Sequence, residues 1–390
     1  MTPPARIAAA IAILDDILSG TAPEPALSRW SRSNRYAGSG DRAAIRDHVF
    51  DALRRRRSFA ALGGATTGRG LMIGAVRAAG GKLDVVFNGT GYAPPPLTDA
   101  EAQHDPGPLP DAVAHDIPDW LETPLRDSLD SDFSAVLTLL QSRAPVFLRV
   151  NVAKTNVAEA RVALAKDGIA TEPHPLANTA LEVTENPRKI VSSQAFRDGL
   201  VELQDAASQA LVADLQMDPA PARILDYCAG GGGKALALAA RTQEAKIFAH
   251  DGLPQRMADL PRRAQRGGAS ITVIGGECLA REAPFDLVLC DVPCSGSGAW
   301  RRQPAAKWEL TAERLQALRT LQLEILTTAT GHVAPHGTLV YATCSLLNAE
   351  NNDQIDRFTA AQPDWRCRSR RIYSPLEGGD GFFCAVLTRD

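Results

Sequence analysis

Apolar side chains recur at helical spacing through the first part of the chain. Residues 5–18 place them every three or four positions, which predicts an amphipathic helix. Residues 41–62 repeat the pattern, and Asp41 is expected to cap the start of a helix there. We therefore assign residues 1–85 to a small helical domain.

After this domain, the helical spacing of apolar side chains ends. Residues 88–124 are rich in Pro, Gly and acidic side chains, so we expect a linker with short helical fragments over 86–124. An extended run at 146–152, a helical stretch at 156–167 and short extended pieces around 181–191 follow. They predict a small α+β module, assigned to 125–220.

From Arg223 onward, short apolar runs alternate with longer helical patterns. This alternation predicts an α/β domain over 221–390, with a mainly parallel, doubly wound sheet of Rossmann-like type. Such sheets bind ligands at the carboxyl ends of their strands. The expected strands are 223–228, 246–251, 271–276, 285–292, 337–344 and 382–389, and the expected helices are 234–242, 254–266, 310–333 and 349–361.

Composition and length are those of a globular protein with two or three domains: 390 residues, 45% hydrophobic and 22% charged. No apolar stretch approaches the roughly 20 residues that span a bilayer. The first residues lack the basic and apolar regions of a signal peptide. We expect a cytoplasmic protein without a membrane partner.

The formal net charge of −3 is unevenly distributed. Residues 99–132 carry a local charge of −9, so the rest of the chain carries +6. Arginines cluster in that remainder, at Arg54 to Arg57, at Arg262, Arg263 and Arg266, at Arg301 and Arg302, and at Arg368, Arg370 and Arg371. Each cluster fits either phosphate binding or an ordinary solvated surface.

All seven cysteines lie after residue 227. An odd number crowded into one half of a long chain does not indicate a disulfide framework, so we expect reduced thiols. Cys290 and Cys294 lack a second Cys/His pair at zinc-like spacing, and we predict no metal site.

A glycine-rich turn follows the first strand of the expected sheet, from Asp226 to Lys234. Glycines let the backbone approach a ligand closely and adopt positive φ, and an acid at a strand end can anchor a cationic amine. The turn lacks the Ser/Thr that would follow the lysine in a phosphate-binding Walker loop, and it does not match the spaced dinucleotide fingerprint. The next strand ends at Asp251, where an acid can accept ribose hydroxyls, and a later one ends near Glu277, which can contact an adenine.

Two cysteines each follow an apolar strand and lie in Pro/Ser/Gly turns: Cys294 in Asp-Val-Pro-Cys and Cys344 in Ala-Thr-Cys-Ser. Both are expected at the same edge of the sheet as the glycine turn. Methylation of a pyrimidine at carbon 5 requires a thiolate to add to carbon 6, and a second group to assist proton transfer or release. Asp291 can steady the base, and Lys234 can reach it, whereas no histidine lies in these motifs to support a hydrolase.

At these motifs the chain resembles the RsmB/Sun-type RNA cytosine-C5 methyltransferases. The similar segments are DYCAGGGGK, DVPCSGSGAWRRQPAAKW, YATCSLLNAENNDQ and Gln204 to Ser208. The resemblance implies an S-adenosyl-L-methionine cofactor, with Cys344 as nucleophile and Cys294 assisting product release. It also implies catalytic contributions from Asp291 and Lys234, and cofactor contacts from Cys228, Ala229, Gly230, Gly231, Gly232, Gly233, Lys234, Asp251, Arg256, Glu277 and Asp291.

The chain departs from the family pattern in two places. Gly230 and Gly231 stand where Ala-Pro is usual and Ala235 where Thr is usual, which makes the loop more flexible. Glu277 stands where Asp is common. The N-terminal part, including 38–56, resembles the NusB-like RNA-binding domain of bacterial RsmB proteins, and 125–220 resembles the family's RNA-recognition-like module.

These features predict a monomeric enzyme that methylates carbon 5 of a cytosine in RNA after flipping the base out. Ribosomal 16S RNA is the expected partner because of the N-terminal resemblance, and transfer RNA is the alternative. An RNA-binding ribosome-assembly factor with little or no activity is the rival from another class, motivated by the altered glycine loop. A methyltransferase acting on DNA or protein is disfavoured by the order of the motifs.

Overall fold

The computed structural model describes residues 1–389, which form two compact units. One unit comprises residues 1–143 and 300–310, and the other comprises 144–299 and 311–390. Residues 125–143, which we assigned to the small module, therefore belong to the first unit, as do residues 300–310 from the stretch assigned to the α/β domain. The four-part division of the chain stays a prediction.

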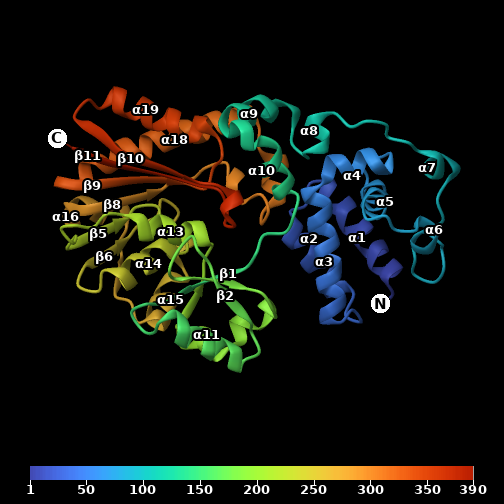
Figure 1. The fold of residues 1–390 in the computed structure, drawn as a ribbon, viewed down its shortest axis with the longest axis horizontal. Helices are drawn as coiled ribbons and strands as arrows, with labels where there is room; N and C mark the ends of the chain where they lie inside the picture. The colour runs from blue at the N-terminus through green and yellow to red at the C-terminus, as the bar shows by residue number, and fades with distance from the viewer. Residues whose placement is uncertain (390) are drawn as a thin grey trace. The chain divides into compact units, whose positions relative to one another are not determined.

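The first unit is helical, as the periodicity predicts (Figure 1). Its core includes Ile13, Leu14, Ile45, Leu53 and Leu71, which are buried against one another. The helices are α1 (Pro3–Leu18), α2 (Pro23–Ser33), α3 (Ser39–Arg54), α4 (Arg56–Gly63), α5 (Gly68–Ala78), α6 (Leu83–Val86), α7 (Asp99–Gln103), α8 (Asp111–Ala114), α9 (Glu122–Leu129), α10 (Phe133–Leu140) and α17 (Pro304–Glu309). The short helices α7 and α8 lie within the expected linker, whereas α6 ends at its first residue.

The prediction that Asp41 caps a helix is wrong. Helix α3 begins at Ser39 with Gly38 as its N-cap. Asp41 lies in the first turn, where its carboxylate accepts from the amine of Met1 at 3.0 Å and from Arg6 at 2.9 Å. The single run predicted over 41–62 is two helices, since the chain turns at residue 55 between α3 and α4.

The arginine run from 54 to 57 serves internal contacts. Arg54 is only 5% exposed, donates to the Arg301 carbonyl oxygen at 2.7 Å and pairs with Asp51 at 2.6 Å. Arg57 pairs with Asp119 at 2.6 Å. A buried guanidinium with protein partners is not available to phosphates, so the phosphate-binding reading is wrong for Arg54.

The second unit contains the small α+β module. Its four-stranded sheet has the order β2-β3-β1-β4, and each neighbouring pair is antiparallel. The elements are β1 (Phe147–Val150), α11 (Val157–Lys166), β2 (Thr171–Pro173), β3 (Ala180–Val183), α12 (Gln194–Arg197) and β4 (Val201–Leu203). The extended pieces predicted around 181–191 end at Val183, because Pro187 to Ser192 form a 3-10 helix.

The same unit contains a seven-stranded sheet in the order β10-β11-β9-β8-β5-β6-β7. Strands β9, β8, β5, β6 and β7 are parallel, whereas β11 and β10 are antiparallel, so the predicted mainly parallel α/β sheet is confirmed. The strands are β5 (Arg223–Asp226), β6 (Lys246–Ala249), β7 (Ile271–Val273), β8 (Phe285–Asp291), β9 (Val333–Thr343), β10 (Trp365–Tyr373) and β11 (Phe382–Arg389). Strand β10 was not predicted, since its run of exposed arginines breaks the apolar pattern.

Helices cover both faces of this sheet (Figure 1). Alternate side chains of the central strands point to opposite faces, so Leu287 and Leu289 pack with α13 and α14, while Val288 and Cys290 pack with α18 and α19. Burial of both faces explains the continuous apolar runs in the sequence. The helices are α13 (Ala206–Asp214), α14 (Gly233–Arg241), α15 (Leu260–Gly267), α16 (Gly276–Glu282), α18 (Ala312–Ala329) and α19 (Asn352–Ala361).

Neither a membrane-spanning helix nor a disulfide is found among residues 1–389. No helix there combines the length and apolarity needed to cross a bilayer. The seven cysteines are free thiols. Within the same range no group of three or more His, Cys, Asp or Glu side chains is arranged to hold a metal ion.

Candidate active site

The carboxyl ends of the parallel strands bring the predicted site residues to one edge of the large sheet. Asp226 ends β5 and Asp291 ends β8, and Cys344 follows the last residue of β9. Adjacent strands are in register at this edge, since Asp226 pairs with Leu289 and Asp291 with Ala342. The topology therefore places the glycine turn and both cysteine loops together, as expected for a doubly wound sheet.

The two cysteines are in direct contact. The Sγ atoms of Cys294 and Cys344 lie 3.4 Å apart, within hydrogen-bond distance for sulfur. The prediction that both cysteines lie at one edge of the sheet is confirmed.

The surroundings of Cys294 favour its protonated form. The hydrogen bond with Cys344 raises the pKa of Cys294 well above its usual value, and burial and the charges of Cys344 and Glu350 raise it further. Cys294 therefore keeps its proton and can donate it in a hydrogen bond to the Cys344 sulfur. The structure thus places a thiol donor against the sulfur of Cys344.

Lys234 and Asp291 form an ion pair beside the cysteines. The Lys234 Nζ lies 2.6 Å from the Asp291 Oδ2 and 5.0 Å from the centre of the Phe382 ring. Burial alone would lower the pKa of Lys234, but the charge of Asp291, the hydrogen bond to it and the charge of Asp226 outweigh burial and raise that pKa. The lysine stays charged, so it can stabilise negative charge that develops on a bound base.

The glycine loop has the backbone conformation that its sequence requires. Gly230 and Gly232 have φ of +52° and +79°, values that other residues rarely adopt. A Cβ atom on Gly232 would lie 2.2 Å from Leu260. The residues from Cys228 to Gly233 thus form a tight turn that ends at the N-terminus of α14, a typical setting for close approach of a ligand to the backbone.

The acids predicted to hold the adenosine differ in their surroundings. Asp251 is 4% exposed and accepts hydrogen bonds from the amides of Gly230 and Leu253, each at 2.8 Å. Arg256 lies 3.3 Å from the same carboxylate. Glu277 is exposed in the first turn of α16 rather than at the end of a strand. Asp251 therefore shapes the glycine loop in addition to any contact with a ligand.

Asp226 has an exceptional environment. It is 1% exposed, and neither of its carboxylate oxygens has a hydrogen-bond partner among residues 1–389. Burial raises its pKa to about 7 and the charge of Asp291 adds to this effect, although the charge of Lys234 and the nearby amide of Ala235 act in the opposite direction. An unsatisfied buried carboxylate beside a glycine loop fits the ammonium group of an amino-acid-containing cofactor, because a charged hydrogen bond to this cation would offset the free-energy cost of burying the carboxylate.

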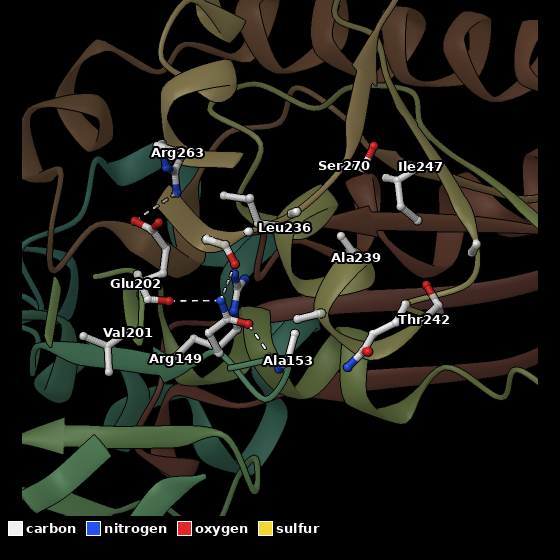
Figure 2. Close-up of a pocket in the computed structure, with 18 residues that line it drawn as sticks. Arg149, Ala153, Val201, Glu202, Leu236, Ala239, Thr242, Ile247, Arg263 and Ser270 are labelled. Carbon is white, nitrogen blue, oxygen red and sulfur yellow. Dashed lines mark hydrogen bonds and ion pairs between the residues drawn. The ribbon is translucent and has the colours of Figure 1, made fainter. Parts of the chain in front are cut away.

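Figure 2 shows a separate cavity of about 290 Å³ in the second unit. It is lined by residues of α14, β6 and α15, by the loops beside them and by residues of the small module, and none of these is a predicted cofactor residue or a cysteine. Arg149 on its wall donates to the carbonyl oxygen of Gly233 at 2.7 Å and to Gln204 at 2.5 Å. Arg149 thus ties β1 to the end of the glycine loop, a role that the sequence pattern did not indicate.

Comparisons with known proteins agree with this geometry. Residues 214–388 match the family described as 16S rRNA methyltransferase RsmB/F, and residues 117–189 match the ferredoxin-like domain of RsmF/B-like methyltransferases. The chain is 35% identical over 291 residues to ribosomal RNA small subunit methyltransferase B of Vibrio cholerae, covering 72% of this chain and 67% of that one. The chain belongs to the RsmB/F family. The relative of the same name in Photorhabdus laumondii is 33% identical and is covered to 66% of its length.

Solved structures share the fold of this RsmB/F family member. The structure of PH0851 has a TM-score of 0.77 at 23% identity, covering 100% of this chain and 99% of that one. NSun6 from Pyrococcus horikoshii, solved with SFG, has a TM-score of 0.61 at 16% identity and covers 70% of this chain and 98% of its own. The predicted Rossmann-like methyltransferase fold is confirmed. The chain is an RNA methyltransferase with S-adenosyl-L-methionine as its cofactor.

Proposed function

We propose that the chain methylates carbon 5 of a cytosine in 16S ribosomal RNA, with Cys344 as the nucleophile and Cys294 as the group that assists release. The contact between the two sulfur atoms, 3.4 Å apart, carries this proposal. The relatives are named for the small ribosomal subunit, which favours ribosomal RNA over transfer RNA. A cytoplasmic location, a NusB-like N-terminal domain and a monomeric state stay predictions.

The reaction begins at Cys344. Its thiolate adds to carbon 6 of the cytosine, and the electron pair of the carbon 5–carbon 6 double bond makes carbon 5 nucleophilic. The positive charge of Lys234 and the carboxylate of Asp291 would orient the base and stabilise the charge that develops on it. When bound, the cofactor supplies an electrophilic methyl group to carbon 5.

Release requires transfer of the carbon 5 proton to a base, for which solvent water suffices. The electron pair of that C–H bond re-forms the carbon 5–carbon 6 double bond as the bond between the Cys344 sulfur and carbon 6 breaks. The sulfur leaves as a thiolate. Cys294 keeps its proton and lies in contact with that sulfur, so its thiol can donate a hydrogen bond to the departing thiolate. This donation lowers the energy of the leaving group, which is the assistance we assign to Cys294.

We assign the cofactor to the glycine loop and the acids around it. Asp226 would bind its ammonium group, the backbone from Cys228 to Gly233 would line its amino-acid part, and Asp251 with Arg256 and Glu277 would lie toward its nucleoside. The orphaned carboxylate of Asp226 supports the first assignment. It was absent from the residues singled out by the family resemblance, although an acid at this strand end was expected to attract an amine.

A groove of about 670 Å³ beside the glycine loop suits an RNA strand. Four arginines line it against only two acids: Arg197, Arg262, Arg263 and Arg266. Val191 and Leu203 on its wall are 62% and 41% exposed, which offers apolar surface to unstacked bases. We propose that single-stranded RNA next to the target base binds here, with phosphates on Arg197 and Arg262.

Mapping of 5-methylcytosine tests the proposed function. The purified protein is incubated with labelled cofactor and with 16S RNA or transfer RNA, and bisulfite sequencing locates the product in cells with and without the gene. We expect one or a few modified cytosines in 16S RNA. Cofactor binding without any 5-methylcytosine would favour the assembly factor, and modification confined to transfer RNA would reassign the substrate.

A further inference from the structure

A buried carboxylate connects the two cysteine loops. Glu350 is fully buried and accepts hydrogen bonds from the Ser295 amide at 2.8 Å and from the Ser295 hydroxyl at 2.5 Å. It also accepts from the Ser345 hydroxyl at 2.5 Å and from the Gln322 side chain at 2.9 Å. Ser295 directly follows Cys294, and Ser345 directly follows Cys344. One carboxylate thus holds the residue after each cysteine.

The neighbouring residue, Asn351, forms hydrogen bonds to the residues before and after Cys344. Its Oδ1 accepts from the hydroxyl of Thr343 at 2.6 Å, and its Nδ2 donates to the carbonyl oxygen of Ser345 at 2.9 Å. The backbone amide of Gly298 donates to the carbonyl oxygen of Cys344 at 2.9 Å. The loop that carries Cys294 is therefore joined to the loop that carries Cys344 directly as well as through Glu350.

We propose that Glu350 is a positioning residue for the methyl transfer reaction, which keeps the Cys294 and Cys344 sulfur atoms in contact. This inference rests on the roles proposed for the two cysteines. Glu350 itself does not touch the substrate or the cofactor in this assignment, and it acts through Ser295 and Ser345.

The physical reason lies in the cost of burying an anion. All the donors to Glu350 are uncharged groups, and a buried carboxylate is tolerated only while its hydrogen bonds are complete. If the two loops separate, the carboxylate loses the donors from one of them and is left partly unsatisfied. A hydrophobic side chain would fill the space without this penalty, so the carboxylate resists loop separation in a way that packing alone does not.

The experiment compares two substitutions of Glu350 with a matched control in the full-length protein. Glu350→Gln keeps the size of the side chain and two of its accepting contacts, whereas Glu350→Ala removes all four. Gln354→Ala alters another fully buried polar side chain of the same region. Gln354 bonds to the Arg319 carbonyl oxygen and to Gln322 but makes no hydrogen bond to Glu350 or to either cysteine loop in the described chain, so it controls for the loss of a buried polar side chain one step away from Glu350. Steady-state methylation of 16S RNA gives kcat and KM, and gel analysis of a 5-fluorocytosine RNA gives the yield of covalent adduct.

We expect kcat of Glu350→Ala to fall on the order of 100-fold with KM for RNA little changed, because a misplacement of about 1 Å has this effect on reacting groups. Glu350→Gln should recover most of the lost rate, and Gln354→Ala should keep wild-type kcat. If Glu350→Ala does not fold, a Glu350→Gln rate below that of Gln354→Ala still supports the proposal. Equal kcat for Glu350→Gln, Glu350→Ala and Gln354→Ala, or a higher KM at unchanged kcat, would overturn it. An inactive wild-type protein would instead refute the proposed function.

Discussion

The cysteine loops and the glycine loop lie at the same edge of one sheet, yet they are stabilised differently. Around the cysteines, the donors from both loops meet one buried carboxylate, Glu350, whose contacts are complete within the protein. Beside the glycine loop, the carboxylate of Asp226 is equally buried but has no partner among the described residues. The two thiols are thus held in place by protein groups alone, whereas the contacts of Asp226 would be completed by the ammonium group of the cofactor in the proposed assignment.

The largest effect is expected from the cysteines themselves. Cys344→Ala removes the nucleophile and should lower methylation by on the order of 10⁴-fold or more, with no covalent adduct. Cys294→Ala should still form the adduct and let it accumulate, because attack remains possible while release is slowed. Denaturing gels of protein with substrate RNA separate the two outcomes. Adduct in Cys344→Ala and none in Cys294→Ala would reverse the assigned roles.

The glycine-loop side of the comparison is tested at Asp226. Asp226→Asn keeps the shape but removes the charge that binds the ammonium group, so cofactor affinity should fall about 10- to 100-fold, the usual loss of a charge-assisted hydrogen bond. Calorimetric titration of S-adenosyl-L-methionine measures it. Asp364→Asn, at an exposed position, serves as the control. Unchanged affinity in Asp226→Asn would show that the ammonium group of the cofactor does not bind at Asp226.

Asp226 should also make stability depend on pH. Its pKa is raised to about 7, so between about pH 4 and pH 7 the folded protein keeps a proton that the unfolded chain releases. The free energy of unfolding should therefore fall as pH rises through this window, by roughly 4 kcal/mol at most. Denaturant unfolding of the cofactor-free protein against Asp226→Asn isolates this dependence. Parallel pH curves for the two proteins would contradict it.

The smallest effect concerns the arginine-lined groove, which lies beside the glycine loop and apart from the thiols. Replacing both Arg197 and Arg262 by Ala should weaken RNA binding about 10-fold and reduce the salt slope by about 1.4, as expected for two phosphates on a single strand. Methylation at saturating RNA should be unchanged. Arg314→Ala with Arg357→Ala, two exposed arginines outside the groove, is the matched control. Equal losses of RNA affinity in both double variants would show that RNA does not bind in this groove.

The spacing of apolar residues predicted the elements whose side chains are buried in a regular pattern. The α/β alternation after Arg223 identified the parallel strands, because both faces of the sheet are buried and each strand is continuously apolar. Strand β10 escaped prediction since its side chains are mostly exposed, and Asp41 was misread because its cationic partners are remote in sequence. Arg54 was misread as surface for the same reason, since its partner Arg301 lies 247 positions away.

The sequence by itself determined the chemistry available to this protein: two cysteines after apolar strands, a glycine turn, and acids at strand ends. These features are local, so short motifs carry them. Only the tertiary structure decided that the two sulfur atoms touch, that Glu350 joins the residue after each cysteine, and that Asp226 is buried without a partner. Burial and long-range hydrogen bonds depend on which segments the fold brings together, and spacing along the chain does not reveal this.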